Sequence, residues 1–245
     1  MGTDIHTFIE VKPENDYWQL VGPRWHWWWD QGKEMTDEER KALLTYHPYT
    51  MRNYNVFAML ASVRNGMGFA GMETGGRVEP IAQPKGLPDD PSPQLAPIVA
   101  AAAADDHTHP AIEKLGWLGY HDFSYLTLAE LDAYAWHDTM QHKGIINLDQ
   151  YAAWRKKEPT WPEGGWSAWV SGGKVVVLDP AEADDMLDSN TGPSGLVYYV
   201  RAQWSSTRAE AANGFYPHVL DEMRDIAADR NATPDGIRLV FGFDS

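Results

Sequence analysis

The sequence predicts an α+β fold, with one domain over residues 1–245 in which the N- and C-terminal strands share a mixed or antiparallel sheet with helices packed around it. Three observations predict it. Strand-like runs stand near both ends of the chain, at Asp4–Lys12 and Ile237–Phe243. Capping boxes and amphipathic stretches between them indicate helices. With 43% hydrophobic and 12% aromatic residues, a chain of 245 residues can bury a core and is not disordered.

The first half of the chain begins with a strand and its return. Apolar and polar residues alternate over Asp4–Lys12, and Asp16–Val21 follows as a hairpin partner. A capping box predicts a helix over Thr36–Tyr46, and apolar residues at helical spacing predict another over Asn55–Val63. Residues 65–90 are rich in Gly and Pro. They indicate a long loop of the length usually kept for binding sites or lids.

The second half mixes helices and strands without an internal repeat or a linker. Thr127-Leu128-Ala129-Glu130 is a second capping box and predicts the start of a helix. Periodicity predicts the other elements. They are helices at Ala100–Ala104, Asp149–Lys156 and Pro217–Asp229, and strands at Lys174–Leu178, Leu196–Gln203 and Ile237–Phe243.

The composition excludes several kinds of chemistry and partner. The chain has no cysteine, which excludes a disulfide, a thiolate metal site and a cysteine nucleophile. With 20 Lys and Arg against 35 Asp and Glu, its net charge of −15 repels polyanions, so we expect no bulk nucleic-acid partner. No apolar run reaches the roughly 18 residues of a membrane helix, and the first residues are not signal-like. We therefore expect no membrane partner and a cytoplasmic location.

Asp4 and His6 stand two residues apart on one face of the first predicted strand. A carboxylate and an imidazole in this arrangement can bind a divalent metal, or can form an Asp-oriented histidine for proton transfer. The alternative is that both are structural. Glu10 lies on the same face of the strand but further along it, and we expect it to have another role.

The segment His121–Tyr125 places an imidazole, a carboxylate and a hydroxyl in a predicted turn before a capped helix. A histidine there can bind an anion beside the helix N-terminus or act as acid and base. The alternative is a histidine that holds the turn by a hydrogen bond. His107 and His109 have the spacing of a metal pair, but their neighbours indicate a solvated loop. Asp4, His6 and His121 are the candidate ligands for a divalent metal.

A locally basic stretch lies between Met51 and Pro88. Arginine forms bidentate bonds to phosphate, and glycine-rich backbone can approach a ligand closely. The alternative is that its arginines pair with structural carboxylates. Gly66–Gly71 matches G-x-G-x-x-G as a string but follows a predicted helix, not a strand, which is the wrong context for a dinucleotide fingerprint. The charged residues of the stretch are Arg52, Arg64, Arg77 and Lys85 against Glu73 and Glu79.

Five segments carry a resemblance over nearly the whole chain: Asp4-Ile5-His6, Arg52-Asn53-Tyr54, Pro84–Asp89, Ser124–Leu128 and Arg238–Asp244. They resemble a family of largely uncharacterised proteins of tailed phages and prophages. Members typically open with Cys-Asp-Ile-His, where this chain has Thr3 in place of the cysteine. The resemblance implies a phage origin and a role in the cytoplasm of the infected host cell, without an established reaction.

The leading hypothesis is a hydrolase with an anti-defence role, a phosphodiesterase that degrades a small nucleotide such as a cyclic immune signal of the host. In it, His6 and His121 are general base and acid or metal ligands, and Asp4 orients or co-ligates. Cationic side chains neutralise phosphate and aromatic side chains stack on bases. The predicted ligand-binding residues are Arg52, Asn53, Tyr54, Arg64, Lys85 and Ser124.

Two other functions fit the same residues. The first is a nucleotide sponge, which uses the arginine and aromatic pocket for binding without chemistry. The second is a module that binds a host factor through the aromatic patch Trp25–Trp29. The excess of aromatic residues also favours a homo-oligomer.

Overall fold

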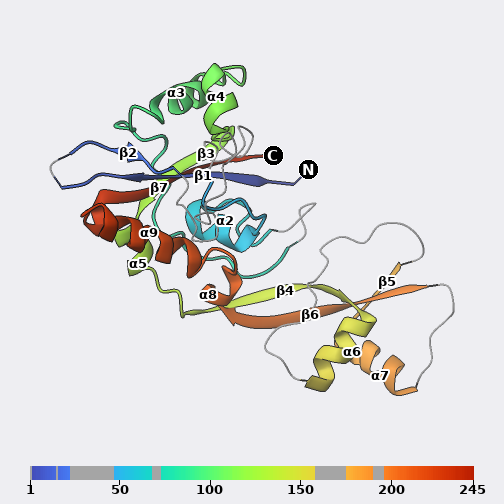
Figure 1. The fold of residues 1–245 in the computed structure, drawn as a ribbon. Helices are drawn as coiled ribbons and strands as arrows, with labels where there is room; N and C mark the ends of the chain where they lie inside the picture. Colours follow the sequence, from blue (N-terminus) through green and yellow to red (C-terminus); the bar gives the residue numbers. More distant parts are fainter. Residues whose placement is uncertain (1, 15, 23–46, 68–72, 158–174, 190–195) are drawn as a thin grey trace, which may run out of the picture. The chain divides into compact units, whose positions relative to one another are not determined.

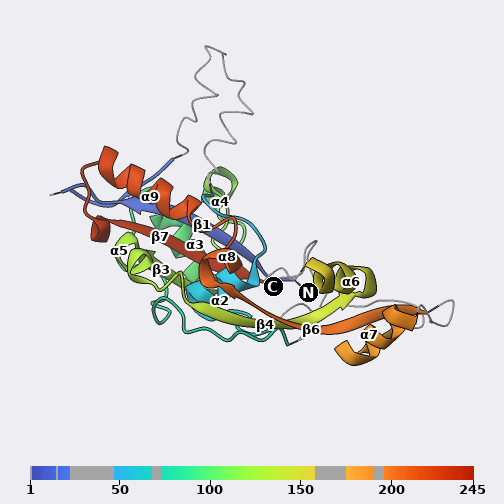
Figure 2. The same cartoon turned by 90° about the horizontal axis from the view of Figure 1, so that it is seen from below.

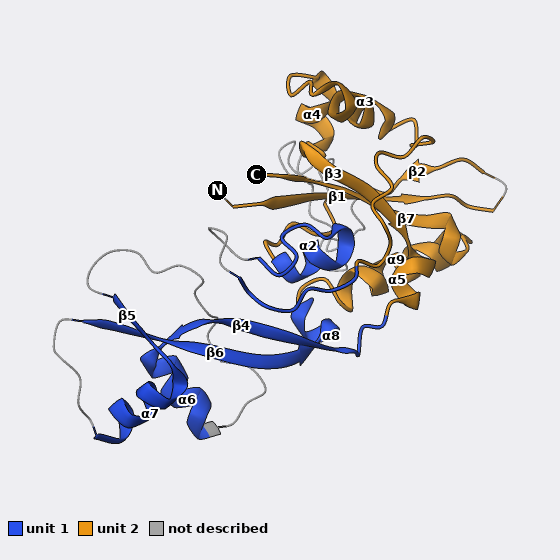
Figure 3. Ribbon diagram, turned by 180° about the vertical axis from the view of Figure 1, so that it is seen from behind, with its two compact units in different colours: residues 1, 54–79, 135–212 blue, residues 2–53, 80–134, 213–245 orange. Residues whose placement is uncertain are grey.

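The computed structural model describes residues 2–14, 16–22, 47–67, 73–157, 175–189 and 196–245. The fold is α+β, as the sequence predicts, and one sheet holds both terminal strands (Figures 1 and 2). Contacts divide the chain into two compact units (Figure 3). Unit 1 contains Tyr54–Glu79 and Ala135–Ala212, and unit 2 contains Gly2–Asn53, Pro80–Tyr134 and Asn213–Ser245. The single domain expected over residues 1–245 stays a prediction.

The sheet of unit 2 is antiparallel and has the strand order β2-β1-β7-β3. β1 and β7 pair along their whole length, from Asp4 opposite Asp244 to Val11 opposite Ile237. The last strand of the chain therefore lies between the first strand and β3. The strands are β1 (Asp4–Val11), β2 (Gln19–Leu20), β3 (His121–Thr127) and β7 (Ile237–Asp244).

Both faces of this sheet are covered, which explains why Leu239, Val240 and Phe241 form an unbroken apolar run. On one face Phe8 and Val240 pack with residues of α3 (Ala96–Ala104) in a buried cluster. α4 (Pro110–Leu115) packs beside α3. On the other face lie α5 (Leu128–Ala133) and α9 (His218–Asp229), which contact β7 (Figure 1).

A buried ion pair joins β1 to β7. Glu10 lies opposite Arg238, and the Nε of Arg238 donates to Oε2 of Glu10 at 2.9 Å. Nη1 of the same guanidinium donates to Oδ1 of Asp90 at 2.8 Å, and the group stacks over the ring of Trp18 at 3.9 Å. Glu10 is fully buried, so its role is structural, separate from that of Asp4 and His6 as predicted.

The sheet of unit 1 has the order β4-β6-β5. β4 (Thr139–Asn147) is antiparallel to β6 (Val197–Thr207), and β5 (Val175–Leu178) is parallel to β6. α6 (Leu148–Lys157) and α7 (Pro180–Ser189) pack side by side against it (Figures 1 and 2). Tyr151 and Ala183 join Ile146 and Val200 in one core. α2 (Tyr54–Ala61) and α8 (Arg208–Ala211) also belong to this unit.

Several elements differ from the sequence prediction. The segment His121–Tyr125 is not a turn: it belongs to β3, which contains an irregularity at its start. The sequence analysis missed β4, α4, α7 and α8, and also the 3-10 turn η2 (Pro234–Gly236). His109 is the N-cap of α4, because its Nδ1 accepts from the backbone N–H of Ala111 at 3.2 Å. The predicted helix over Thr36–Tyr46 and the patch Trp25–Trp29 lie outside the described residues.

The prediction about membrane spans can be compared with the helices that the structure describes. None of these helices combines the length and the apolar character needed to cross a bilayer.

Candidate functional site

His6 lies near the start of β1, on the face of the unit 2 sheet that Phe8 shares. Its Nε2 is 2.9 Å from Oδ2 of Asp244, and about a quarter of each side chain is exposed. The ring of His47 stands edge-on to that of His6, with centroids 6.4 Å apart. Nδ1 of His47 donates to the carbonyl of Thr7 at 2.9 Å, and burial holds the pKa of His47 below its ordinary value.

Asp4 lies on the same face as His6, but its carboxylate is bound to Arg52. Nε and Nη2 of Arg52 donate to the two carboxylate oxygens at 2.8 and 2.6 Å. This bidentate pair is the main cause of a lowered pKa for Asp4. Arg52 is thus neutralised by a carboxylate of the fold, which is the alternative that the sequence left open.

His121 lies at the start of β3, opposite Phe243, and the two rings stack with centroids 6.4 Å apart. Its Nε2 is 3.1 Å from Oγ of Ser245, and its Nδ1 is 2.7 Å from Oδ2 of Asp122. Oγ1 of Thr3 is 3.0 Å from the same Ser245 oxygen. His121 therefore belongs to a hydrogen-bonded chain of four polar side chains, Thr3, Ser245, His121 and Asp122.

The two histidines of the predicted site lie on opposite faces of the sheet. His6 is opposite Gly242 and His121 is opposite Phe243, and consecutive residues of β7 point to opposite faces. Asp4 and His6 share a face as predicted, but His121 does not join them. In the described part of the chain, no three His, Asp or Glu side chains gather in a way that could hold a metal ion. The roles assigned to Asp4, His6 and His121 stay predictions.

Lys85 and Ser124 meet in unit 2 through hydrogen bonds that hold the fold. Nζ of Lys85 donates to both carboxylate oxygens of Glu130 at 2.7 Å and lies 4.8 Å from the ring centre of Tyr125. The backbone N–H of Lys85 donates to Oγ of Ser124, which is buried, at 3.0 Å. Asn53 uses its side-chain amide to donate to the carbonyl of Asn213 at 3.4 Å.

Tyr54 and Arg64 belong to unit 1, whereas the other predicted ligand-binding residues belong to unit 2. The guanidinium of Arg64 lies 5.7 Å from the centre of the Tyr54 ring, a cation–π contact across α2. Within its own unit, therefore, this cation also has a structural neighbour.

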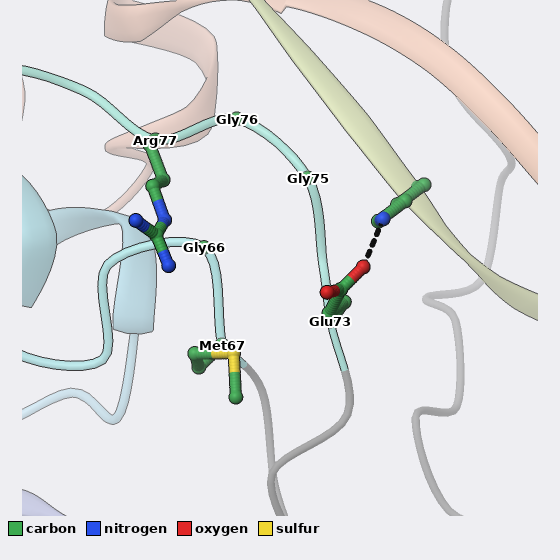
Figure 4. Close-up of a pocket in the computed structure, with 7 residues that line it drawn as sticks. Gly66, Met67, Glu73, Gly75, Gly76 and Arg77 are labelled. Carbon is green, nitrogen blue, oxygen red and sulfur yellow. Dashed lines mark hydrogen bonds and ion pairs between the residues drawn. The ribbon is translucent and has the colours of Figure 1, made fainter.

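A cavity of about 340 Å³ lies in unit 1, between the loop after α2 and β4. Met67 and Glu73 form a bridge in this loop, and the N–H of Thr74 donates to the carbonyl of Gly66 at 2.9 Å. The N–H of Lys143 donates to the carbonyl of Thr74 at 2.9 Å and so fixes the loop to β4. The described lining residues are Gly66, Met67, Glu73, Gly75, Gly76, Arg77 and Lys143 (Figure 4).

The glycines of this cavity are required by its backbone. Gly66, Gly75 and Gly76 have positive φ angles of 75°, 72° and 49°. A Cβ on Gly76 would collide with the carbonyl oxygen of Gln141, and one on Gly66 would lie 2.8 Å from Cγ of Arg77. The loop can follow β4 this closely only because these side chains are absent.

Of the two cationic side chains that line the cavity, one is in an ion pair and the other is not. Glu73 and Lys143 form an ion pair, which lowers the pKa of Glu73. Arg77 is exposed, and within the described chain its guanidinium forms neither a hydrogen bond nor an ion pair. The N–H groups of Gly75 and Gly76 likewise donate no hydrogen bond to described residues. These donors remain available to an anion.

Sequence reasoning included Arg77 in a basic stretch but did not select it as a site residue, and it missed Lys143 entirely. The signal was the run Glu73-Thr74-Gly75-Gly76-Arg77, in which two glycines separate opposite charges. Lys143 carries no such signal, because only the pairing of β4 with the loop brings it to the cavity.

Comparisons of the chain with protein-family models, with curated proteins and with solved structures give no significant match. The candidate sites therefore depend on geometry alone.

Proposed function

We propose that this protein binds a small phosphate-bearing ligand of the nucleotide class in the unit 1 cavity, and that it holds the ligand without converting it. The volume of about 340 Å³ is at the lower end of the range for small-molecule sites, which suits one mononucleotide or the phosphate end of a larger one. If the resemblance to tailed-phage proteins is correct, the ligand is a nucleotide signal of the host, and the protein is a sponge.

The observation that carries this proposal is the guanidinium of Arg77. It lines a cavity and forms no hydrogen bond or ion pair with the described chain, although Arg77 is near enough to Glu73 to contribute to the lowered pKa of that carboxylate. A guanidinium can form two parallel hydrogen bonds to a phosphate, and charge-assisted bonds of this kind are stronger than neutral ones. Lys143 stands at the same cavity as a second cation, held by Glu73, which a phosphate can replace.

Backbone geometry supports the same ligand chemistry. Successive N–H groups in turns with positive φ form concavities that bind anions. Gly75 and Gly76 provide two such groups at the cavity. No aromatic ring is among the described lining residues, so what these residues recognise is the phosphate, not the base.

Binding without turnover is favoured over the phosphodiesterase hypothesis by the placement of the histidines. A phosphodiester needs its general base and general acid near one phosphorus atom. His6 and His121 lie on opposite faces of a sheet, and Arg52 and Lys85 are each bound by a carboxylate. The alternative of a host-factor module depends on Trp25–Trp29, which lie outside the described residues.

Isothermal titration calorimetry tests the proposal with pyrophosphate, a nucleoside triphosphate and a cyclic dinucleotide. Arg77→Ala and Lys143→Ala should each weaken binding about tenfold or more, because each removes a bond to a charged group. Arg201→Ala is the matched control: it removes an exposed arginine of the same unit that is paired with Asp179. It should leave the dissociation constant unchanged.

The bound ligand is then released by heating and analysed by mass spectrometry. Intact ligand is expected from the proposal. A new product would replace sequestration with catalysis and restore the phosphodiesterase hypothesis. Absence of binding for every anion, or binding that neither Arg77→Ala nor Lys143→Ala weakens, would refute the cavity as the site.

A further inference from the structure

The hydrogen-bonded chain around His121 in unit 2 has the order of a nucleophile, a base and an orienting carboxylate. Ser245 Oγ is 3.1 Å from Nε2 of His121, and Oδ2 of Asp122 is 2.7 Å from Nδ1. Both distances are within the reach expected for a serine activated by a histidine, whose other nitrogen a carboxylate holds. None of these residues is among the described lining residues of the unit 1 cavity, so this inference is independent of the proposed function.

The proton positions follow from the partners. A carboxylate only accepts, so Nδ1 of His121 carries the proton that it donates to Asp122. In the neutral form of the ring, Nε2 is then an acceptor for the hydroxyl proton of Ser245. The hydroxyl of Thr3 can donate to the Ser245 oxygen, 3.0 Å away. Every group in the chain thus has a compatible role, and the neutral imidazole is ready to accept the serine proton.

An irregularity in β3 makes this geometry possible. Neighbouring residues of a regular strand point to opposite faces, so a histidine cannot normally bond the carboxylate of the next residue. The pairing register shifts between His121 and Ser124, and Asp122 has a φ of 51°. This unusual backbone turns the Asp122 carboxylate towards the preceding ring. Bulges and positive φ angles at residues other than glycine occur preferentially at functional sites.

The reacting groups are open to solvent. The His121 side chain is 37% exposed and that of Asp122 is 50% exposed, and Ser245 is exposed as well. Thr3, in contrast, is fully buried, and its hydroxyl is hydrogen-bonded to the hydroxyl of Ser245. The side chains of His121 and Asp122 are therefore accessible to a substrate.

We infer that Ser245, His121 and Asp122 form a hydrolytic site for small uncharged carboxylic esters. The hydroxyl oxygen of Ser245 attacks the ester carbonyl while its proton passes to Nε2 of His121. The carbon–oxygen bond to the alcohol breaks, and the alcohol leaves with that proton. Water then attacks the acyl-serine, with His121 again taking and returning a proton, to give the acid and free Ser245. Asp122 is a positioning residue that fixes the ring.

The negative charge near Ser245 favours an uncharged ester over a phosphate as the substrate. The hydrogen-bonded chain contains the Asp122 carboxylate and no cationic side chain other than the histidine that must be neutral. The protein as a whole carries a net charge of −15. Both repel an anionic substrate, whereas an uncharged ester meets no such barrier.

The test uses p-nitrophenyl acetate and a fluorophosphonate probe that modifies activated serines. We expect the full chain to hydrolyse the ester and the probe to label Ser245, as mapped by peptide mass spectrometry. Ser245→Ala and His121→Ala should each reduce the rate at least tenfold. His107→Ala is the control, because His107 is another partly exposed histidine of unit 2 that pairs with an aspartate, Asp105, but not with a serine. Its rate should equal that of the unchanged protein.

The positioning role of Asp122 has its own readout. Asp122→Asn should lower kcat with KM unchanged, and the unfolding transition should not move, because the pair is exposed. The inference is overturned if Ser245→Ala keeps the rate of the unchanged protein, or if the probe labels that variant equally. It is also overturned if His107→Ala loses as much activity as His121→Ala, since the hydrolysis would then come from surface histidines in general.

Discussion

Arg77 of unit 1 differs from three cations of unit 2 in the groups that it contacts. In unit 2, Arg52, Lys85 and Arg238 are each bound by a carboxylate of the same unit. In unit 1, Arg77 lines a cavity and has no such partner in the described chain. A basic residue is a better candidate for an anion site when no carboxylate of the fold is bound to it. A phosphate at Arg52 would have to displace Asp4, whereas at Arg77 it would break no hydrogen bond or ion pair of the described chain.

The largest effect on stability should come from the most buried of the paired cations. Arg238→Ala leaves Glu10 charged and without its partner in the core, and we expect a loss of about 3–5 kcal/mol in the free energy of unfolding. Urea denaturation measures it. Arg230→Ala, at the exposed end of α9, is the control and should change stability by less than about 0.5 kcal/mol. A change of less than about 0.5 kcal/mol for Arg238→Ala would show that the buried ion pair with Glu10 does not stabilise the fold.

A second prediction tests whether free charge is what distinguishes the cavity. Glu73→Gln removes the carboxylate that holds Lys143 and so leaves two uncompensated cations at one site. We expect the dissociation constant for pyrophosphate to fall several-fold, and the gain to shrink in high salt, because these side chains are exposed. Calorimetric titration at two salt concentrations measures this. Weaker binding after Glu73→Gln would mean that Glu73 contacts the ligand or shapes the loop.

The smallest effect belongs to the exposed pair of Asp4 and Arg52. Both side chains are about half exposed, so Asp4→Asn should cost less than about 1 kcal/mol. Because Arg52 lowers the pKa of Asp4, the contribution of the pair is complete above the ordinary value of 3.8 and is lost as the pH falls through the lower value of the folded protein. The difference in unfolding free energy between Asp4→Asn and the unchanged protein should therefore vanish in acid.

A double-mutant cycle tests whether this small loss in the free energy of unfolding comes from the interaction between Asp4 and Arg52. Arg52→Ala should cost about as much as Asp4→Asn, and the combined variant should cost less than the sum of the two. Full additivity of the two losses would show that the carboxylate and the guanidinium do not stabilise one another.

The fold was predictable where local pattern and tertiary structure agree. The alternation in β1 predicted its strand, because Ile5, Thr7 and Ile9 are all buried on one face. The capping box at Thr127 is present as predicted, with Thr127 Oγ1 accepting from the N–H of Glu130 at 3.2 Å. Such signals depend on residues close in sequence, and a single chain shows them directly.

β3 and the cavity were not predictable, because both depend on contacts between residues that are distant in the sequence. Asp122 has a positive φ and the register of β3 shifts after His121, so this strand lacks the regular alternation that would identify it in the sequence. The separation of His6 from His121 depends on whether each strand pairs with Gly242 or with Phe243, and one residue of register decides it. Lys143 reaches Glu73 only through the pairing of β4 with a distant loop. No local pattern contains that information.

The central place of β7 in its sheet also constrains the order in which unit 2 can form. A ribosome synthesises β1 before β3, and β7, which lies between them in the sheet, follows both. Until β7 is available the growing chain cannot close this sheet, and unpaired apolar strands of this kind are prone to aggregate. A nascent chain that stalls before Ile237 would expose β1 and β3 without the strand that joins them.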